Sequence, residues 1–160
     1  AGDRWVRKHV ATLLQSYARA PFRDWVEDLS VLLERPWTNL SDLDVAVTEW
    51  MCDRLGLTTP RIRASSLGPI DGRAQDLVIG LCRQLGARTY LSGPGARAYQ
   101  REQEFGKAGL RLEYQVYQPP AWPQCHPALG FLPSLSALDL LLNVGPSALE
   151  VLRRGRRRAA

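Results

Sequence analysis

The most constraining feature of the sequence is an alternation of helical and extended patterns between residues 71 and 117. After Asp71-Gly72 the clearest helical period of the chain runs to Gly86, with apolar residues at Ala74, Leu77, Val78, Leu81, Cys82 and Leu85. Thr89-Tyr90-Leu91 then has the composition of a strand, and Leu110–Tyr117 alternates strictly, with an apolar residue at every second position. Strands separated by helices indicate right-handed crossovers in a parallel sheet.

A further short β-like stretch follows Pro60, at Arg61-Ile62-Arg63-Ala64-Ser65. The sequence therefore predicts an α/β fold with three layers, in which helices cover both faces of a mostly parallel sheet. We expect at least three strands, at Ile62–Ala64, Thr89–Leu91 and Leu110–Tyr117. Within this fold we expect Leu77, Leu81 and Leu85 to be buried together.

Helical patterns flank this region on both sides. We expect helices at Trp5–Tyr17, from Phe22 to Pro36, from Asn39 or Ser41 (either can cap the helix) to Gly56, at Leu135–Asn143 and at Pro146–Leu152. A chain of 160 residues fits one core, so the sequence predicts a single α/β domain over residues 1–152. Residues 153–160 form a basic, arginine-rich tail.

Composition and charge exclude several classes of protein. Hydrophobic residues make up 45% of the chain and charged residues 23%, as in globular proteins. No apolar run approaches the roughly 20 residues of a membrane span, so we expect no transmembrane segment. The net charge of +5 comes from five arginines in the last eight residues, because the rest holds 16 basic and 16 acidic residues. This tail is either solvated or a patch for an acidic partner, and the lack of interleaved aromatic residues argues against nucleic acid.

The cysteine and histidine content limits the kinds of cross-link and metal site that the chain can form. Three cysteines without metal-type spacing, together with only two histidines, argue against a disulfide framework and against a metal site. We expect a reducing, cytoplasmic setting. No particular cofactor is predicted, and the donor and acceptor of any reaction stay open.

The first candidate site is Ser92-Gly93-Pro94-Gly95, where a predicted parallel strand leads into a helix. Ligands bind at this carboxyl edge of open α/β sheets, and glycines let the backbone approach an anion closely. Ser92, Gly93 and Gly95 are therefore candidate substrate-binding residues, with Arg97 as the cation. The alternative is a tight turn that needs glycine for a positive φ.

The second candidate site is Gln124-Cys125-His126, where a thiol adjoins an imidazole. His126 is a candidate general acid or base, Cys125 a weaker candidate nucleophile, and Gln124 a candidate substrate contact. Downstream, Ser136, Asp139 and Asn143 recur at helical spacing. Asp139 is a second catalytic candidate or, alternatively, binds nearby backbone N–H groups, whereas we expect Ser136 to cap its helix.

The order of these segments resembles the WbqC-like protein family. The resemblance rests on Tyr90–Pro94, Leu112–Tyr117, Trp122-Pro123-Gln124, Phe131–Leu141, Asn143 and Gly145-Pro146, and upstream on Trp5–His9, Tyr17–Phe22 and Asn39–Leu43. Family members also carry an N-terminal Gln-Pro-x-Tyr-x-Pro-Trp type motif, which does not precede Trp5. This departure implies an N-terminally incomplete chain, or a partner that supplies the segment.

The resemblance implies a bacterial enzyme that transfers an acyl or aminoacyl group to a sugar or similar acceptor in surface-polysaccharide (O-antigen) or secondary-metabolite biosynthesis. Its substrates would be small molecules or activated sugars. In this hypothesis Ser92, Gly93 and Gly95 hold an anionic donor, Arg97 neutralises it, and His126 or Asp139 handles the proton. We expect the Ser92–Gly95 loop and His126 to border one cleft. The alternative is a non-catalytic interaction or scaffold module, a truncated relative of such an enzyme.

Overall fold

The computed structural model describes residues 4–156. Their contacts divide the chain into two compact units, which we describe separately. Unit 1 comprises residues 1–58 and 119–155, and unit 2 comprises residues 59–118 and 156–160. The single domain over residues 1–152 stays a prediction.

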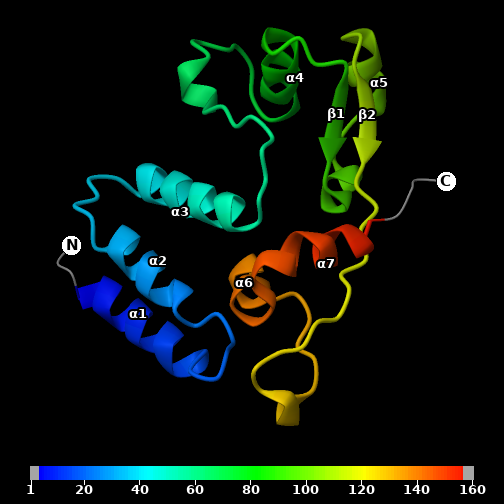
Figure 1. The fold of residues 1–160 in the computed structure, drawn as a ribbon. Helices are drawn as coiled ribbons and strands as arrows, with labels where there is room; N and C mark the ends of the chain where they lie inside the picture. Colours follow the sequence, from blue (N-terminus) through cyan, green and yellow to red (C-terminus); the bar gives the residue numbers. More distant parts are fainter. Residues whose placement is uncertain (1–3, 157–160) are drawn as a thin grey trace. The chain divides into compact units, whose positions relative to one another are not determined.

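Unit 1 is built from helices (Figure 1). In chain order they are α1 (Arg4–Ser16), α2 (Trp25–Leu33), α3 (Leu40–Arg54), the short 3-10 helix η3 (Pro127–Leu129), α6 (Ala137–Val144), the 3-10 turn η4 (Gly145–Ser147) and α7 (Ala148–Arg154). The helices predicted from the apolar spacing are therefore confirmed. Asn39 is the cap of α3, because its side-chain oxygen accepts the Asp42 N–H at 2.8 Å. Gly56 follows the end of α3 with φ +67°, the conformation that closes a helix.

Helix α6 lies at the centre of unit 1. Six consecutive residues, 138–143, are buried, and Leu140, Leu141 and Leu142 are completely inaccessible. A helix that is buried all round has to be enclosed by other elements. Leu138 and Leu142 pack against α1, α2 and α3, while Leu140 and Leu141 pack toward α7 and the end of α3.

Arg54 at the end of α3 connects α3 to α2. Its guanidinium forms an ion pair with Asp28 and lies 4.7 Å from the ring centre of Trp25 and 5.5 Å from that of Trp50. Stacking on two indoles fixes a planar guanidinium where a flexible lysine would not be held.

Unit 2 contains a two-stranded parallel sheet, β1 (Thr89–Ser92) and β2 (Arg111–Tyr114), in the register Thr89↔Arg111 to Ser92↔Tyr114. The other elements are the 3-10 helix η1 (Ala64–Ser66), α4 (Gln75–Gln84), the 3-10 helix η2 (Pro94–Ala98) and α5 (Glu102–Lys107). Helix α5 lies on the crossover between the strands (Figure 1). The mixed α/β class and the parallel pairing are confirmed.

The sheet is smaller than predicted, and the three-layer arrangement is not confirmed. Residues 61–63 form no strand in the structure, and η1 begins at Ala64. Ile62 is the one large apolar residue there and is exposed, so this stretch has no face to bury. Strand β2 ends at Tyr114 rather than Tyr117, because its partner β1 stops at Ser92 and Pro94 has no N–H for the ladder.

The core of unit 2 differs from the predicted leucine face. Ile79, Cys82, Phe105, Leu110 and Leu112 are buried together, and the Tyr90 ring stacks on that of Phe105 at 5.6 Å. The predicted burial of Leu77, Leu81 and Leu85 is wrong, since Leu77 and Leu85 are exposed and Leu81 is half-buried. The buried face of α4 is turned away from the predicted one: Ile79 lies about 200° around the helix from Leu77, and of the two buried residues only Cys82 belongs to the predicted stripe.

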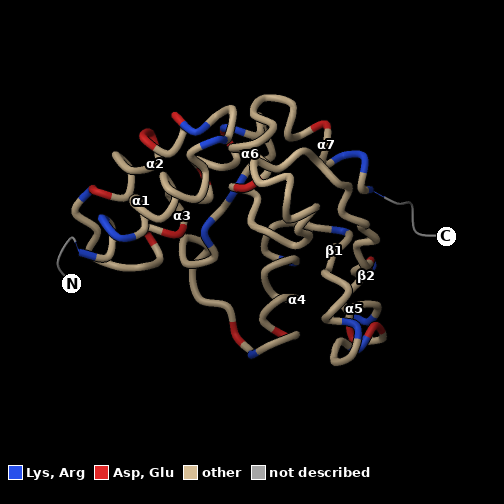
Figure 2. The backbone as a smooth tube through the Cα atoms, turned by 90° about the horizontal axis from the view of Figure 1, so that it is seen from below, with Lys and Arg blue, Asp and Glu red and all other residues tan. Residues whose placement is uncertain are grey.

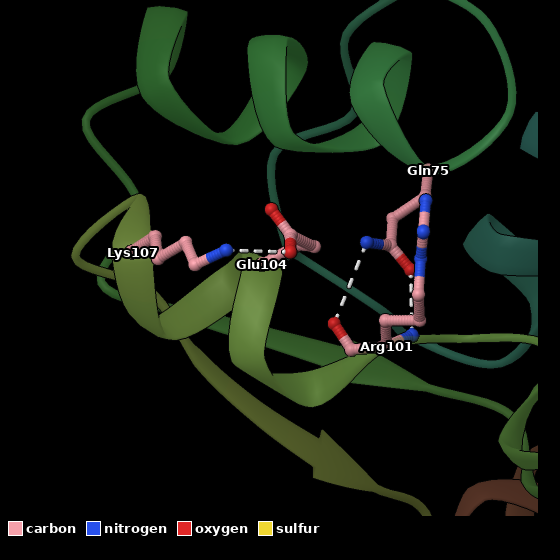
Figure 3. A network of polar contacts seen from close by, with 4 residues as sticks. All are labelled: Gln75, Arg101, Glu104 and Lys107. Carbon is pink, nitrogen blue, oxygen red and sulfur yellow. Dashed lines mark hydrogen bonds and ion pairs between the residues drawn. The ribbon is translucent and has the colours of Figure 1, made fainter.

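A side-chain amide holds the start of α5 to the start of α4 (Figure 3). The Gln75 oxygen accepts the Arg101 N–H at 2.7 Å, and the Gln75 NH₂ donates to the Arg101 carbonyl at 3.4 Å. Further along α5, Lys107 pairs with Glu104 at 2.9 Å. The Gln75 amide thus replaces a backbone partner for the residue that precedes α5.

Part of the predicted basic tail belongs to the folded chain. Arg153 and Arg154 are the last residues of α7, where Arg154 pairs with Glu150 at 2.7 Å, and Arg156 forms an isolated bridge with Tyr117. Arg157 and Arg158 lie outside the described residues. Basic and acidic residues are interspersed along the described chain (Figure 2). No helix within residues 4–156 has the length and apolarity needed to cross a membrane.

Candidate functional site

The candidate site of unit 1 is centred on the carboxylate of Asp139, which is only 3% exposed. Ser136 accepts the Leu138 N–H at 3.2 Å and thereby caps α6, as expected. This start places Asp139 in the first turn, where a negative charge is favoured by the helix dipole. Its carboxylate is then presented to the preceding loop.

Three side-chain N–H groups donate hydrogen bonds to this carboxylate. Trp122 Nε1 lies 2.8 Å and Gln124 Nε2 2.9 Å from Oδ2, while Asn143 Nδ2 lies 3.2 Å from Oδ1 and 2.8 Å from the Asp139 carbonyl oxygen. A buried charge is tolerated when donors surround it in this way. Asp139 therefore binds side-chain donors, and not the backbone N–H groups of the alternative prediction.

Gln124 organises the loop rather than presenting a free amide. Its oxygen accepts the Leu132 N–H at 2.8 Å, and its NH₂ donates to the Leu132 carbonyl at 3.1 Å as well as to Asp139. These bonds close residues 124–132 into a loop held against α6. Direct substrate binding by Gln124 stays a prediction.

Tyr17, just beyond α1, faces the same carboxylate. Its pKa is raised from 10.0 to about 12, first by burial, then by the negative charge of Asp139 and a hydrogen bond to it, and last by Cys125. The phenol therefore stays protonated at neutral pH and acts as a hydrogen-bond donor.

This pKa shift predicts an alkaline loss of stability. The folded state favours the neutral phenol, so its contribution is complete below pH 10 and is lost as the pH rises through about 12. The stability difference between the wild type and Tyr17→Phe should therefore shrink over this range. Denaturant titrations at several alkaline pH values measure it, and a difference that is independent of pH would contradict the assignment.

Cys125 and His126 both contact the end of α1 through the Ser16 carbonyl oxygen. The Cys125 Sγ lies 3.7 Å and the His126 Nε2 2.6 Å from this oxygen. Because a carbonyl only accepts, Nε2 carries a proton, which leaves Nδ1 of neutral His126 as the acceptor. Burial raises the pKa of the Cys125 thiol, and the Asp139 charge adds to it, which disfavours a thiolate nucleophile.

These groups line a small cavity of about 90 Å³. Its wall comprises Ser16, Tyr17, Gln124, Cys125, His126, Gly130, Leu132, Leu135 and Asp139. The structure thus brings together both predicted catalytic residues, His126 and Asp139, and the predicted Gln124. Within residues 4–156 no three His, Cys, Asp or Glu side chains are placed to hold a metal ion.

The predicted anion loop lies in unit 2. Ser92 ends β1 and is buried, whereas Gly93, Gly95 and Arg97 are exposed. Gly93 has φ −69°, Gly95 has no positive φ, and nothing lies within 4 Å of a Cβ added at either, so this turn does not require glycine. The Arg97 guanidinium lies 4.6 Å from the ring centre of Tyr114. The cleft predicted between this loop and His126 joins residues of two units and stays a prediction.

The sequence did not single out Tyr17 as a site residue. Tyr17 continues the apolar spacing of α1, which predicts a core position, and its contact with Asp139 spans 122 positions, from residue 17 to residue 139. No local pattern reports such a contact. The i, i+4 pair of Asp139 and Asn143 was the available signal, because both polar residues recur on an apolar helix.

Together the fold and the site define a mixed α/β protein with a buried, hydrogen-bonded carboxylate beside a histidine. The chain belongs to the WbqC-like protein family, whose model matches residues 1–151. It is 33% identical over 161 aligned positions to an uncharacterized protein of Mycobacterium tuberculosis, an alignment that covers 95% of this chain and 66% of the relative. The chain thus spans about two thirds of the length of that relative. No solved structure matches this chain.

Proposed function

We propose that the chain is a group-transfer enzyme that moves an acyl or aminoacyl group from an activated donor to a sugar or similar acceptor. The observation that best supports this proposal is the histidine beside a buried carboxylate in one small cavity. Family membership supports it further through the resemblance to proteins of polysaccharide and secondary-metabolite assembly. We also propose a cytoplasmic location, where activated donors are made.

His126 acts as the general base in this proposal. Its Nε2–H is held by the Ser16 carbonyl, so Nδ1 accepts the proton of the acceptor hydroxyl or amine. The freed oxygen or nitrogen forms a bond to the acyl carbon, and the bond between that carbon and the donor's leaving group breaks. The imidazolium then returns its proton to the leaving group.

Asp139 and Tyr17 prepare the cavity for this step. The carboxylate holds Trp122, Gln124 and Asn143 in place, which fixes the loop that carries His126. The protonated Tyr17 phenol donates to Asp139 and so helps to hold the carboxylate in position. In the same proposal Ser92, Gly93, Gly95 and Arg97 bind the anionic part of the donor.

The test uses glycyl and acetyl thioesters of N-acetylcysteamine as donors and hydroxylamine as the acceptor. The protein should accelerate release of the free thiol over buffer, and His126→Gln should lower that rate about a hundredfold, as expected for loss of a general base. Thiol release is followed with a chromogenic disulfide.

His9→Gln is the matched control, because His9 is the other histidine and its Nδ1 contacts the Trp5 carbonyl oxygen at the far end of α1. This variant should keep the wild-type rate. Equal rates for wild type and His126→Gln would contradict the role of His126, and no acceleration with either thioester would contradict acyl transfer.

The second candidate is an interaction module, which the apolar surface of the loop favours. Leu129 is 66% exposed, and Phe131, Leu132 and Leu135 are 37%, 43% and 43% exposed. Several apolar side chains exposed close together are typical of a surface that a partner covers. Two results together would favour this candidate. The wild-type protein would show no thioester turnover, and it would form a stable complex with a partner that the Leu129→Ser variant does not form.

A further inference from the structure

A second cavity of unit 1, with a volume of about 720 Å³, lies at the opposite end of α1 from Asp139. It is lined by the first turn of α1, by Leu33 at the end of α2 and by residues 34–38, which follow α2. In Figure 1 the start of α1 and the end of α2 lie at the same end of this helix pair. Small-molecule sites occupy roughly 300–1,000 Å³, so the cavity has the size of a ligand site.

Two indoles form fixed walls of this cavity. The Trp37 Nε1–H donates to the Leu32 carbonyl at 3.0 Å, which sets the plane of its ring. The Trp5 ring meets that of His9 edge-on, with centroids 5.6 Å apart. Both indoles are half-buried, so each keeps accessible surface. Indoles that are held in position are suited to stacking on a flat aromatic ligand.

Two guanidiniums, of Arg7 and Arg35, also line the cavity and are exposed. Within residues 4–156 neither forms an ion pair with a carboxylate. Glu34 is the one carboxylate among the lining residues, so positive charge predominates. Guanidinium groups bind phosphate through paired N–H donors.

We propose that this cavity binds a mononucleotide, with the base against Trp5 or Trp37 and the phosphate on Arg7 and Arg35. The cavity offers two indoles and two cations, which fits one base and one phosphate rather than a strand of nucleic acid. This site is separate from the Asp139 cavity, since α1 runs 13 residues from Arg4 to Ser16, or roughly 20 Å at 1.5 Å per residue. It does not depend on the proposed group transfer.

Calorimetric titration of the full chain with AMP, GMP, CMP and UMP tests the proposal. At least one mononucleotide should bind saturably at one site. The matching nucleoside and inorganic phosphate should each bind about tenfold more weakly or worse, because each lacks one of the two recognition elements. Failure of all four to bind saturably up to millimolar concentration overturns the proposal.

The variant Arg7→Gln/Arg35→Gln should weaken mononucleotide binding at least about tenfold. Its matched control is Lys8→Gln/Arg19→Gln, which removes the same charge from exposed positions that do not line the cavity. Equal affinity of the two double variants would show that only net charge matters and would overturn the site. Binding of oligouridylate that tightens with length and weakens equally in both variants would identify a nucleic-acid surface instead.

Discussion

Gly145→Ala should lower the free energy of unfolding of unit 1 by about 2–6 kcal/mol. Gly145 is buried between α6 and α7 with φ +63° and ψ −135°, a region populated almost only by glycine, where a Cβ costs roughly 1–3 kcal/mol. That Cβ would also overlap three atoms of the Phe22 ring. Phe22 cannot move aside freely, because its N–H bonds the Leu142 carbonyl at 3.0 Å and its ring packs 5.2 Å from that of Trp25. Overpacking of this kind costs roughly a further 1–3 kcal/mol.

Urea denaturation followed by tryptophan fluorescence measures this effect. All five tryptophans, Trp5, Trp25, Trp37, Trp50 and Trp122, fall within the residues of unit 1, so the signal reports on that unit. Gly56→Ala is the control, because Gly56 also has a positive φ, +67°, but nothing lies within 4 Å of a Cβ added there. It should lose only the roughly 1–2 kcal/mol of the backbone effect.

The contribution of Phe22 can be isolated with a second substitution. If the ring causes the overlap, Phe22→Leu should cost less in Gly145→Ala than in the wild type, since the smaller side chain relieves the clash. Equal losses for Gly145→Ala and Gly56→Ala would show that the ring moves aside and would contradict the packing described here.

Asp139→Ala should destabilise unit 1 by about 3–5 kcal/mol. The substitution leaves the Trp122 Nε1–H, the Gln124 NH₂ and the Asn143 NH₂ without their carboxylate acceptor. A buried donor without a partner costs roughly 1–3 kcal/mol, and these three share one site. Because Gln124 also holds the loop at Leu132, the loss should extend to the order of residues 124–132.

Two further variants separate hydrogen bonding from charge. Asp139→Asn keeps one oxygen for Trp122 and Gln124 and should lose less, about 1–2 kcal/mol. Asp44→Ala removes an exposed carboxylate from α3 and should change stability by no more than about 0.5 kcal/mol. Denaturation followed by helical circular dichroism avoids the altered environment of Trp122. A loss below about 1 kcal/mol for Asp139→Ala would mean that water replaces the carboxylate and that the donors are not fixed by it.

The local structure of this protein was largely readable from its sequence. Apolar spacing located every α-helix of unit 1, and the residues at their ends act as predicted, with Asn39 and Ser136 as caps and Gly56 as the terminator. The two strands were found through their composition and alternation. Helix caps and strand patterns depend on residues close in sequence, so local rules suffice for them.

The candidate site was only partly accessible to the same reasoning. Gln124, His126 and Asp139 were predicted, because polar residues in an apolar helix and the adjacent thiol and imidazole are visible locally. The partners that define the roles of these residues were not predicted. Tyr17 contacts Asp139, and Ser16 contacts His126, each across more than 100 positions of the sequence. Gln124 was predicted to contact substrate, yet its amide bonds the loop and Asp139.

The sequence by itself determined the class of elements, the parallel pairing of the two strands and the family, because each follows from residue spacing or motif order. Tertiary structure alone decided which face of α4 is buried: Leu77 and Ile79 lie about 200° apart around the helix, and packing buries the side of Ile79 while it leaves Leu77 exposed. It also decided that Ile62 joins no strand, and that Gly145 is needed where the Phe22 ring closes on it. These outcomes depend on which elements pack against each other in the folded chain. The order of apolar and polar residues along the sequence does not specify those tertiary contacts.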